Sequence, residues 1–79
     1  MLFKEATSQR ILDLCKQYYY TPNKLAEMSS IPPSTLRALL DNKVNNPSSY
    51  SIYKICRTLK IDLKEFYNSD LFKIDNIED

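Results

Sequence analysis

The chain has 79 residues, enough for one domain with a single modest core, and 43% of them are hydrophobic while 27% are charged, a balance typical of globular proteins. It contains no histidine and no glycine, so it lacks the usual general base, the commonest metal ligand and the glycine-rich loops that hold phosphates; we expect no enzyme activity, no metal and no cofactor. The net charge of +1 divides unevenly, because residues 1–69 carry ten basic and six acidic side chains, whereas residues 70–79 carry one basic and four acidic ones.

Two helices are predicted within the first 30 residues. Over residues 6–19 an apolar stripe repeats at steps of three and four, with polar side chains such as Arg10 on the opposite face. The stripe consists of Ile11, Leu14, Cys15 and Tyr18. Thr21 offers an N-cap hydroxyl and Pro22 suits the first helical position, so a second helix starts there. Its apolar side is Leu25, Ala26 and Met28.

Adjacent prolines separate the second helix from a third. A proline pushes the residue before it toward extended geometry, which ends one helix near Ile31, while Pro33 suits the first turn of the next. Leu36, Leu39 and Leu40 form the buried stripe of this third helix. Its outer side consists of Pro33, Ser34, Arg37, Ala38 and Asp41. Asn42 can close the helix in left-handed geometry.

Two further helices complete the predicted domain. Ser48 is the expected N-cap of the fourth helix, whose stripe is Ile52, Ile55, Cys56 and Leu59. Asp62 and Glu65 have capping-box spacing before a short fifth helix. No strand pattern is present, so we expect an all-α, compact five-helix domain over residues 1–69, followed by an acidic and apolar tail over residues 70–79.

The two cysteines and the start of the chain fit a cytoplasmic protein. Cys15 and Cys56 fall on apolar helical positions and outside any Cys-x-x-Cys pair, so we interpret both as small core residues. No apolar run approaches the roughly 20 residues of a membrane span, and no charged leader precedes an apolar stretch. We therefore expect no membrane partner, and nothing points to a small-molecule substrate.

Five small or apolar residues lie at regular places between Pro22 and Leu40: two early in the second helix, one after the turn, and two in the third helix. They are Leu25, Ala26, Ile31, Leu36 and Leu39. In this order the segment resembles the helix-turn-helix of the Cro and phage-repressor class, the XRE family of bacterial transcriptional regulators. The stretches STLRALLDNKVNNPSS and IYKICRTLKIDLKEF extend the resemblance to about residues 8–67. It implies a lambda-repressor-like fold, in which helices 2 and 3 form the helix-turn-helix and helix 3 enters the major groove of double-stranded DNA.

The chain departs from the pattern of that family in two respects. The family usually has glycine where this chain has Ser30, Asn42 and Lys60, so we expect these three residues to take left-handed backbone conformations at some cost in stability. Many relatives also place long polar side chains early in the recognition helix, where this chain has Pro33, Ser34 and Ala38. Its direct means of reading bases are therefore few.

The outer side of the third helix supplies the candidate base contacts. Arg37 can donate two hydrogen bonds to guanine, whereas Pro33 and Ala38 can pack on thymine methyl groups. Ser34 and Thr35 lie in the first turn, where hydroxyls and unpaired backbone N–H groups favour phosphate or a base edge.

Phosphate contacts are expected on either side of that helix. Thr21 and its neighbouring amides begin the second helix, where an anion is favoured. The family resemblance implies that the loop grips the DNA backbone through Lys43, Asn45, Asn46 and Ser48. Asp41, an acid beside this face, would repel phosphate.

Each candidate also has a purely structural interpretation. Arg37 can be a solvated surface charge, and Ser34 and Thr35 can serve only to start a helix. Lys43 can complement a helix dipole, and Asn45-Asn46-Pro47 can be turn chemistry alone.

The tail leaves three possibilities open. If the fifth helix ran on, Leu71, Ile74 and Ile77 would extend one apolar face with Phe66 and could form a dimer seam; otherwise the tail folds back on its own core or frays. A homodimer would suit a face with few base contacts, since two half-sites about 34 Å apart on a pseudo-palindrome supply selectivity.

The sequence favours a sequence-specific DNA-binding regulator, most simply a repressor that occupies an operator. The alternative keeps the fold without DNA readout, as a protein-interaction module such as an antitoxin or antirepressor that presents its apolar tail to a partner. The mild basic excess of residues 1–69 permits DNA binding without arguing for it.

Overall fold

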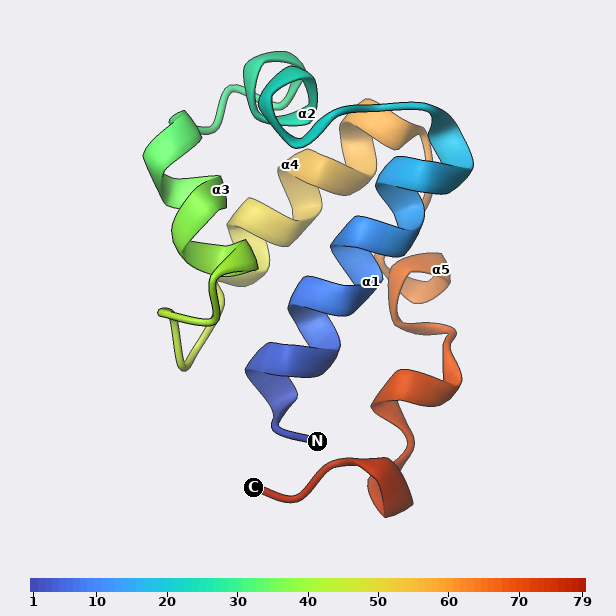
Figure 1. The fold of residues 1–79 in the computed structure, drawn as a ribbon. Coiled ribbons are helices and arrows are strands. Elements are labelled where there is room, and N and C mark those ends of the chain that lie inside the picture. Colours follow the sequence, from blue (N-terminus) through green and yellow to red (C-terminus); the bar gives the residue numbers. More distant parts are fainter.

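The computed structural model describes all 79 residues, and its regular structure is entirely helical, as predicted (Figure 1). The five α-helices are α1 (Phe3–Tyr18), α2 (Pro22–Met28), α3 (Pro33–Leu40), α4 (Ser49–Leu59) and α5 (Leu63–Tyr67), followed by the 3-10 turns η1 (Asp70–Phe72) and η2 (Ile74–Asn76). α1 crosses the middle of the bundle and contacts α2, α3 and η1, whereas α4 contacts α2 and α5. No helix is both long and apolar enough to cross a membrane.

One core joins all five helices. It contains thirteen buried side chains: Ile11, Leu14, Cys15, Leu25, Ala26, Ile31, Leu36, Leu39, Ile52, Ile55, Cys56, Leu59 and Phe66. These include most of each predicted stripe, while Tyr18 and Leu40 pack against the core from a half-buried position. The expectation for Met28 was wrong, because this side chain is 54% exposed at the last residue of the short helix α2.

Four helices end in the same left-handed turn. The residues with positive φ are Tyr19, Ser30, Asn42 and Lys60, with φ between 55° and 61°, which confirms the three predicted positions and adds Tyr19. In each case the next residue donates its backbone N–H to a carbonyl five positions earlier, as in the bond from Ile31 to Ala26 at 3.0 Å. This bond satisfies a carbonyl that the helix end would otherwise leave unpaired, and it offsets the cost of a left-handed residue that has a Cβ atom.

Two details of the helix ends differ from the sequence pattern. α1 begins at Phe3, three residues earlier than predicted, because the Glu5 carboxylate accepts a hydrogen bond from the Leu2 N–H at 2.7 Å and caps the helix. The predicted capping bond of Asp62 is absent, and α5 begins without a side-chain cap.

Arg10 was predicted on the polar face of α1, opposite the apolar stripe, but the structure packs it against α5. Its side chain is half-buried and lies 6.0 Å from the centre of the Phe66 ring. Arg10 Nε donates to the Phe66 carbonyl at 2.6 Å, and Nη2 donates to the Glu65 carbonyl at 2.8 Å. The last carbonyls of a helix lack intrahelical partners, so Arg10 satisfies α5 and fixes it against α1.

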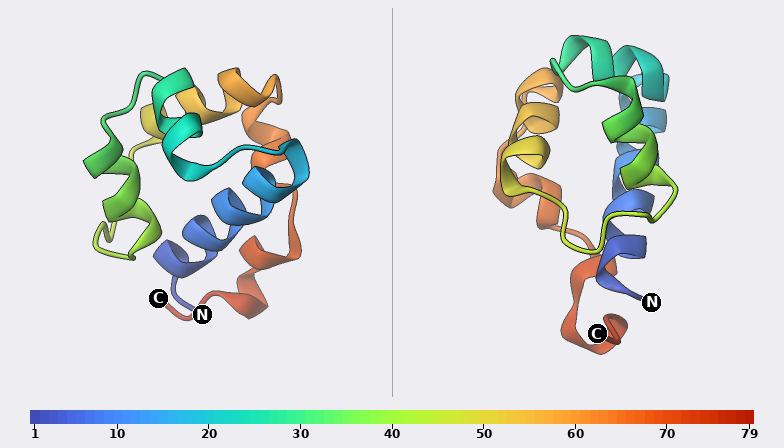
Figure 2. Two further views of the ribbon diagram at one scale, coloured as in Figure 1. Left: turned by 45° about the horizontal axis from the view of Figure 1, so that its top comes forward. Right: turned by 90° about the vertical axis from the view of Figure 1, so that its left-hand side faces the viewer.

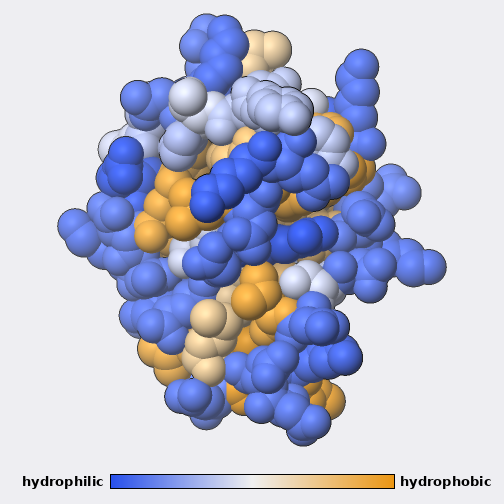
Figure 3. Space-filling model, turned by 45° about the vertical axis from the view of Figure 1, so that its right-hand side comes forward, coloured by the Kyte–Doolittle hydropathy of each residue, from blue (hydrophilic) through white to orange (hydrophobic).

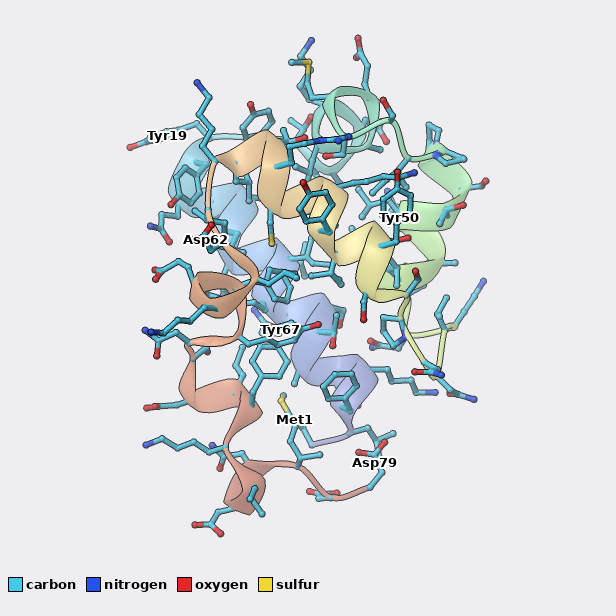
Figure 4. The ribbon with its side chains drawn as sticks, turned by 180° about the vertical axis from the view of Figure 1, so that it is seen from behind. Met1, Tyr19, Tyr50, Asp62, Tyr67 and Asp79 are labelled. Carbon is cyan, nitrogen blue, oxygen red and sulfur yellow. The ribbon has the colours of Figure 1, made fainter.

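The tail folds back along α1 instead of extending α5. Phe72 packs against Phe3 and Phe66 with ring centres 5.9 and 6.1 Å apart, and it meets Tyr67 edge-on at 5.0 Å. Burial raises the pKa of the Tyr67 phenol. Met1 and Asp79 end up close together, as Figure 4 shows, and the Phe3 N–H donates to Asp79 Oδ1 at 2.9 Å. The fold-back possibility is therefore the one that the structure contains, and it covers much of the apolar surface of the tail.

Both thiols lie in the core, and burial raises the pKa of Cys15 and of Cys56. A folded state that resists thiol ionisation loses stability once the unfolded chain releases its protons. We therefore expect the free energy of unfolding to be insensitive to the thiols below pH about 8.5, the ordinary thiol pKa, and to fall as the pH rises above it.

Urea unfolding at a series of pH values checks this expectation. A double variant with Cys15→Ala and Cys56→Ala should show a shallower decline at alkaline pH, whatever its stability at neutral pH. An equally steep decline in the double variant would assign the effect to other groups.

Candidate nucleic-acid interface

The platform of the candidate site is α3, which lies across one side of the bundle between the α2 turn and the following loop (Figure 1). Pro32 is its N-cap with extended backbone, and Pro33 occupies the first helical position, as the double proline predicted. Leu36 and Leu39 are buried beneath the helix, which contacts α1 and α2. The opposite flank of α3 therefore faces solvent.

All ten predicted site residues reach the surface, on α3 or on the segments before and after it. Nine of them are exposed, namely Thr21, Pro33, Ser34, Thr35, Arg37, Lys43, Asn45, Asn46 and Ser48, while Ala38 is half-buried. They come from the start of α2, the outer flank of α3, the loop at residues 41–48 and the start of α4. The right-hand view of Figure 2 looks at the molecule from the side of α3, with α3 in green and the loop in yellow-green.

Thr21 and Ser48 act as N-caps in a way that leaves their hydroxyl protons available. Thr21 Oγ1 accepts from the Lys24 N–H at 3.1 Å, and Ser48 Oγ accepts from the Tyr50 N–H at 3.2 Å. A hydroxyl has one donor and two acceptor sites, so either side chain can cap its helix and still donate to an anion. The structural and the phosphate-binding interpretations of these two residues are compatible.

The loop after α3 is fixed to α1 by side chains. Ser8 Oγ lies 2.8 Å from Asn42 Oδ1, and Lys4 Nζ donates to Asn45 Oδ1 at 2.9 Å. The Ser8 contact explains why an asparagine can replace glycine at this left-handed position, since its side chain ties α1 to the end of α3. Lys4 adds a positive charge beside the loop, and this contact could not be predicted from local patterns because the two residues are 41 positions apart.

Arg37 and Asp41 form an exposed ion pair at 4.0 Å, one helical turn apart. Exposed pairs of this kind contribute only about 0.3–0.5 kcal/mol, so the guanidinium can leave Asp41 for a stronger acceptor at little cost. Asp41 forms no ion pair other than the one with Arg37. Its carboxylate holds Arg37 along the outer flank of α3.

Polar contacts hold the turn between α2 and α3 against α4. Ser29, which is buried, lies 2.7 Å from Thr58 through the two hydroxyl oxygens. Thr58 Oγ1 also lies within hydrogen-bond distance of the carbonyls of Met28 and Lys54, at 3.1 and 3.2 Å. A hydroxyl pair of this kind, with Ser29 buried and Thr58 half-buried, specifies the position of the turn, and hence the direction in which α3 leaves it.

The comparisons with known proteins agree with this geometry. The model of the Cro/C1-type HTH DNA-binding domain matches residues 10–69, which contain all five α-helices apart from the first residues of α1. Neither the curated proteins nor the solved structures give a match. The helix-turn-helix consists of α2 and α3, and the predicted fold is confirmed. The chain belongs to the family of Cro/C1-type helix-turn-helix DNA-binding domains.

Proposed function

We propose that the protein is a repressor that recognises a specific operator by placing α3 in the major groove of DNA. DNA binding and a role in transcription regulation follow from the family. The observation that supports this proposal is exposure: nine of the ten candidate residues are exposed, on α3 and on the segments before and after it, and buried leucines anchor α3.

Within this proposal the residues divide into two groups. Arg37 reads guanine, and Pro33 and Ala38 contact thymine methyl groups, while Ser34 and Thr35 reach a base edge or a phosphate at the start of α3. The remaining contacts position the protein on the DNA backbone and carry no sequence information. They are Thr21, Lys43, Asn45, Asn46 and Ser48, with Lys4 added from the structure.

A second copy of the chain completes the proposed recognition. A single α3 offers one long side chain for base readout, Arg37, so one half-site gives little discrimination. In a two-fold homodimer on a pseudo-palindrome with half-sites about 34 Å apart, each half-site contributes the same free-energy difference between the right and a wrong sequence. The ratio of the two affinities is therefore squared.

The test begins by selecting bound duplexes from a random pool and then compares two substitutions. Arg37→Ala should remove the preference at one base position of each half-site, which costs about 1–3 kcal/mol there, and should weaken generic binding less. Lys43→Ala should weaken binding to all sequences alike and reduce the slope of log K against log salt by about 1. Fluorescence anisotropy on the selected site and on scrambled duplex measures both.

Two results would contradict the proposal. One is a pool that yields no enriched sequence although the protein is folded. The other is an Arg37→Ala variant that keeps the full preference of the parent protein. The first result would favour the interaction-module alternative.

A further inference from the structure

Two large tyrosines are exposed on the outer side of α4. Tyr50 is 62% exposed and Tyr53 is 45% exposed, and their rings are nearly parallel, with centres 6.4 Å apart. Lys54 Nζ lies over the Tyr50 ring, 4.7 Å from its centre. The Arg57 guanidinium lies over the Tyr53 ring, 5.7 Å from its centre. We call these four side chains the tyrosine–cation face, and because they already hold one another in place, a partner loses little conformational entropy on binding them.

The tyrosine–cation face has positive charge that nothing in the chain balances. No acidic residue occurs from position 42 to position 61, and Lys54, Arg57 and Lys60 form no ion pair. Lys64, on α5, forms none either. Lys54 Nζ lies 3.5 Å from the Ser30 carbonyl, a neutral acceptor. The charge of this region is therefore available to an acidic partner.

A shallow hollow at the junction of α4 and α5 continues this face. Its lining consists of Tyr53, Arg57, Lys60, Ile61, Asp62 and Leu63. Leu63 is 39% exposed and Ile61 is half-buried, so the hollow has an apolar wall beside the cations. An apolar side chain fits such a hollow, and carboxylates next to it would meet Arg57 and Lys60.

The other hollow of the molecule does not suit an acidic partner. It lies between α1 and the tail, and Asp13 and Asp70 contribute to its lining. Its one cation is the Met1 amino group, which is paired with Glu78 at 2.9 Å. Apolar side chains also reach the surface on the side of α5 and the tail, but hydrophilic side chains surround them (Figure 3).

The tyrosine–cation face is separate from the candidate DNA surface. In Figure 4 α4 crosses the side toward the viewer, with Tyr50 near its first turns and the connection at Asp62 beyond its end. α3 lies at the right-hand edge of the same view. A partner on the outer side of α4 can therefore leave α3 free.

The geometry favours a protein segment over other anionic partners. Single-stranded nucleic acid stacks its bases on free aromatic faces, but here a cation lies over each tyrosine ring, and Asp62 would repel phosphate. A small molecule needs a site that buries most of its surface, and this hollow is shallow. From Tyr50 to Lys60 the chain rises by about 15 Å, a length that about five extended residues cover. Tyrosine and arginine are also the residues that contribute most to binding at protein interfaces.

We infer that the tyrosine–cation face and the adjoining hollow bind an acidic segment of another protein, in which carboxylates flank an apolar residue. The apolar residue enters the hollow against Tyr53 and Leu63, and the carboxylates pair with Arg57 and Lys60. The rest of the segment lies along α4 toward Tyr50. The protein binds this partner and DNA at the same time. The inference goes beyond the proposed function and does not depend on it.

The test begins with random peptides of about ten residues displayed on phage, selected on the parent protein and counter-selected on Arg57→Glu. The enriched peptides should contain several acidic residues next to an aliphatic or aromatic one. Fluorescence anisotropy then measures the affinity of one labelled enriched peptide without DNA. Arg57→Glu and Tyr53→Ala should each weaken its binding by about tenfold or more. The same peptide with its acids replaced by lysine should not bind the parent.

Lys16→Glu is the matched control, because Lys16, like Arg57, is an exposed basic residue in the last turn of its helix. Its affinity for the peptide should stay within about twofold of the parent. Lys43→Glu, on the candidate DNA surface, should behave in the same way. Adding saturating selected duplex should change the peptide affinity by less than about threefold at physiological salt, where charges more than about 8 Å apart are screened. Circular dichroism confirms that each variant is folded.

Three results would overturn the inference. The first is a pool that enriches no acidic peptide. The second is a peptide that duplex displaces or that Lys43→Glu no longer binds, because it would occupy the DNA surface. The third is an oligothymidine strand that displaces the peptide and loses its affinity in Arg57→Glu, which would make the face a nucleic-acid site. A protein that selects an operator but no acidic peptide keeps the proposed function intact.

Discussion

Replacing Leu36 with alanine should lower the free energy of unfolding by about 2–5 kcal/mol and remove DNA binding with it. Leu36 is 1% exposed and belongs to the one core of the molecule. α3 has eight residues, too few to be stable as an isolated helix, so its position depends on the leucines beneath it. A cavity there removes both the transfer free energy of the side chain and the support of the candidate reading surface.

Met28→Ala provides the control for that substitution. Met28 is also apolar and helical, but it lies in solvent at the end of α2, so its loss should change stability by no more than about 0.5 kcal/mol. Urea unfolding followed by circular dichroism gives both values. A small effect at Leu36, comparable with that at Met28, would mean that α3 is not held by this part of the core.

Most of the fold could be predicted from local signals. The double proline indicates the end of α2 and the start of α3, since both the fixed φ and the missing N–H of proline act within a few residues. The left-handed positions of Ser30, Asn42 and Lys60 could be located because the family places glycine there, and the structure confirms all three. Tyr19 was missed because nothing in its residue type favours positive φ.

What the sequence did not predict depends on contacts between distant segments. Arg10 looks like a solvated residue on its own helix, and only the carbonyls at the end of α5, 55 and 56 residues away, give it a buried role. The tail pattern fits a longer α5 as well as a fold-back, and the choice is made by Phe72 packing on Phe3 at the other end of the chain. Lys4 was added to the candidate site because of the same kind of distant contact, its hydrogen bond to Asn45.

The candidate site itself was predicted at the level of position and not of geometry. The residues on the outer flank of α3 follow from the buried stripe, because the two faces of a helix are complementary. The pairing of Arg37 with Asp41 and the double use of Thr21 and Ser48 could not be read from the sequence, since each depends on side-chain conformation. These contacts decide which groups are available to DNA and which are occupied.

Ser34→Glu should act on stability and on DNA binding in opposite directions. Ser34 follows Pro33 in the first turn of α3, which contains no acidic residue, so a carboxylate there complements the helix dipole and should stabilise the fold by about 0.3–1 kcal/mol. The same carboxylate would face the phosphates and acceptor-rich base edges of the major groove. We expect binding to weaken by about a hundredfold or more, because like charges brought together in an interface cost several kcal/mol.

This opposition separates a surface that contacts DNA from one that only starts a helix. Gln17→Glu is the control, because it introduces the same residue and the same change in net charge at an exposed position of α1 outside the candidate site; its affinity should stay within about twofold of the parent. Thermal unfolding gives the stability change, and fluorescence anisotropy on the selected duplex gives the affinity. If Ser34→Glu stabilised the protein and bound DNA as tightly as Gln17→Glu does, the first turn of α3 would serve the helix alone, and the reading face would have to lie elsewhere on the molecule.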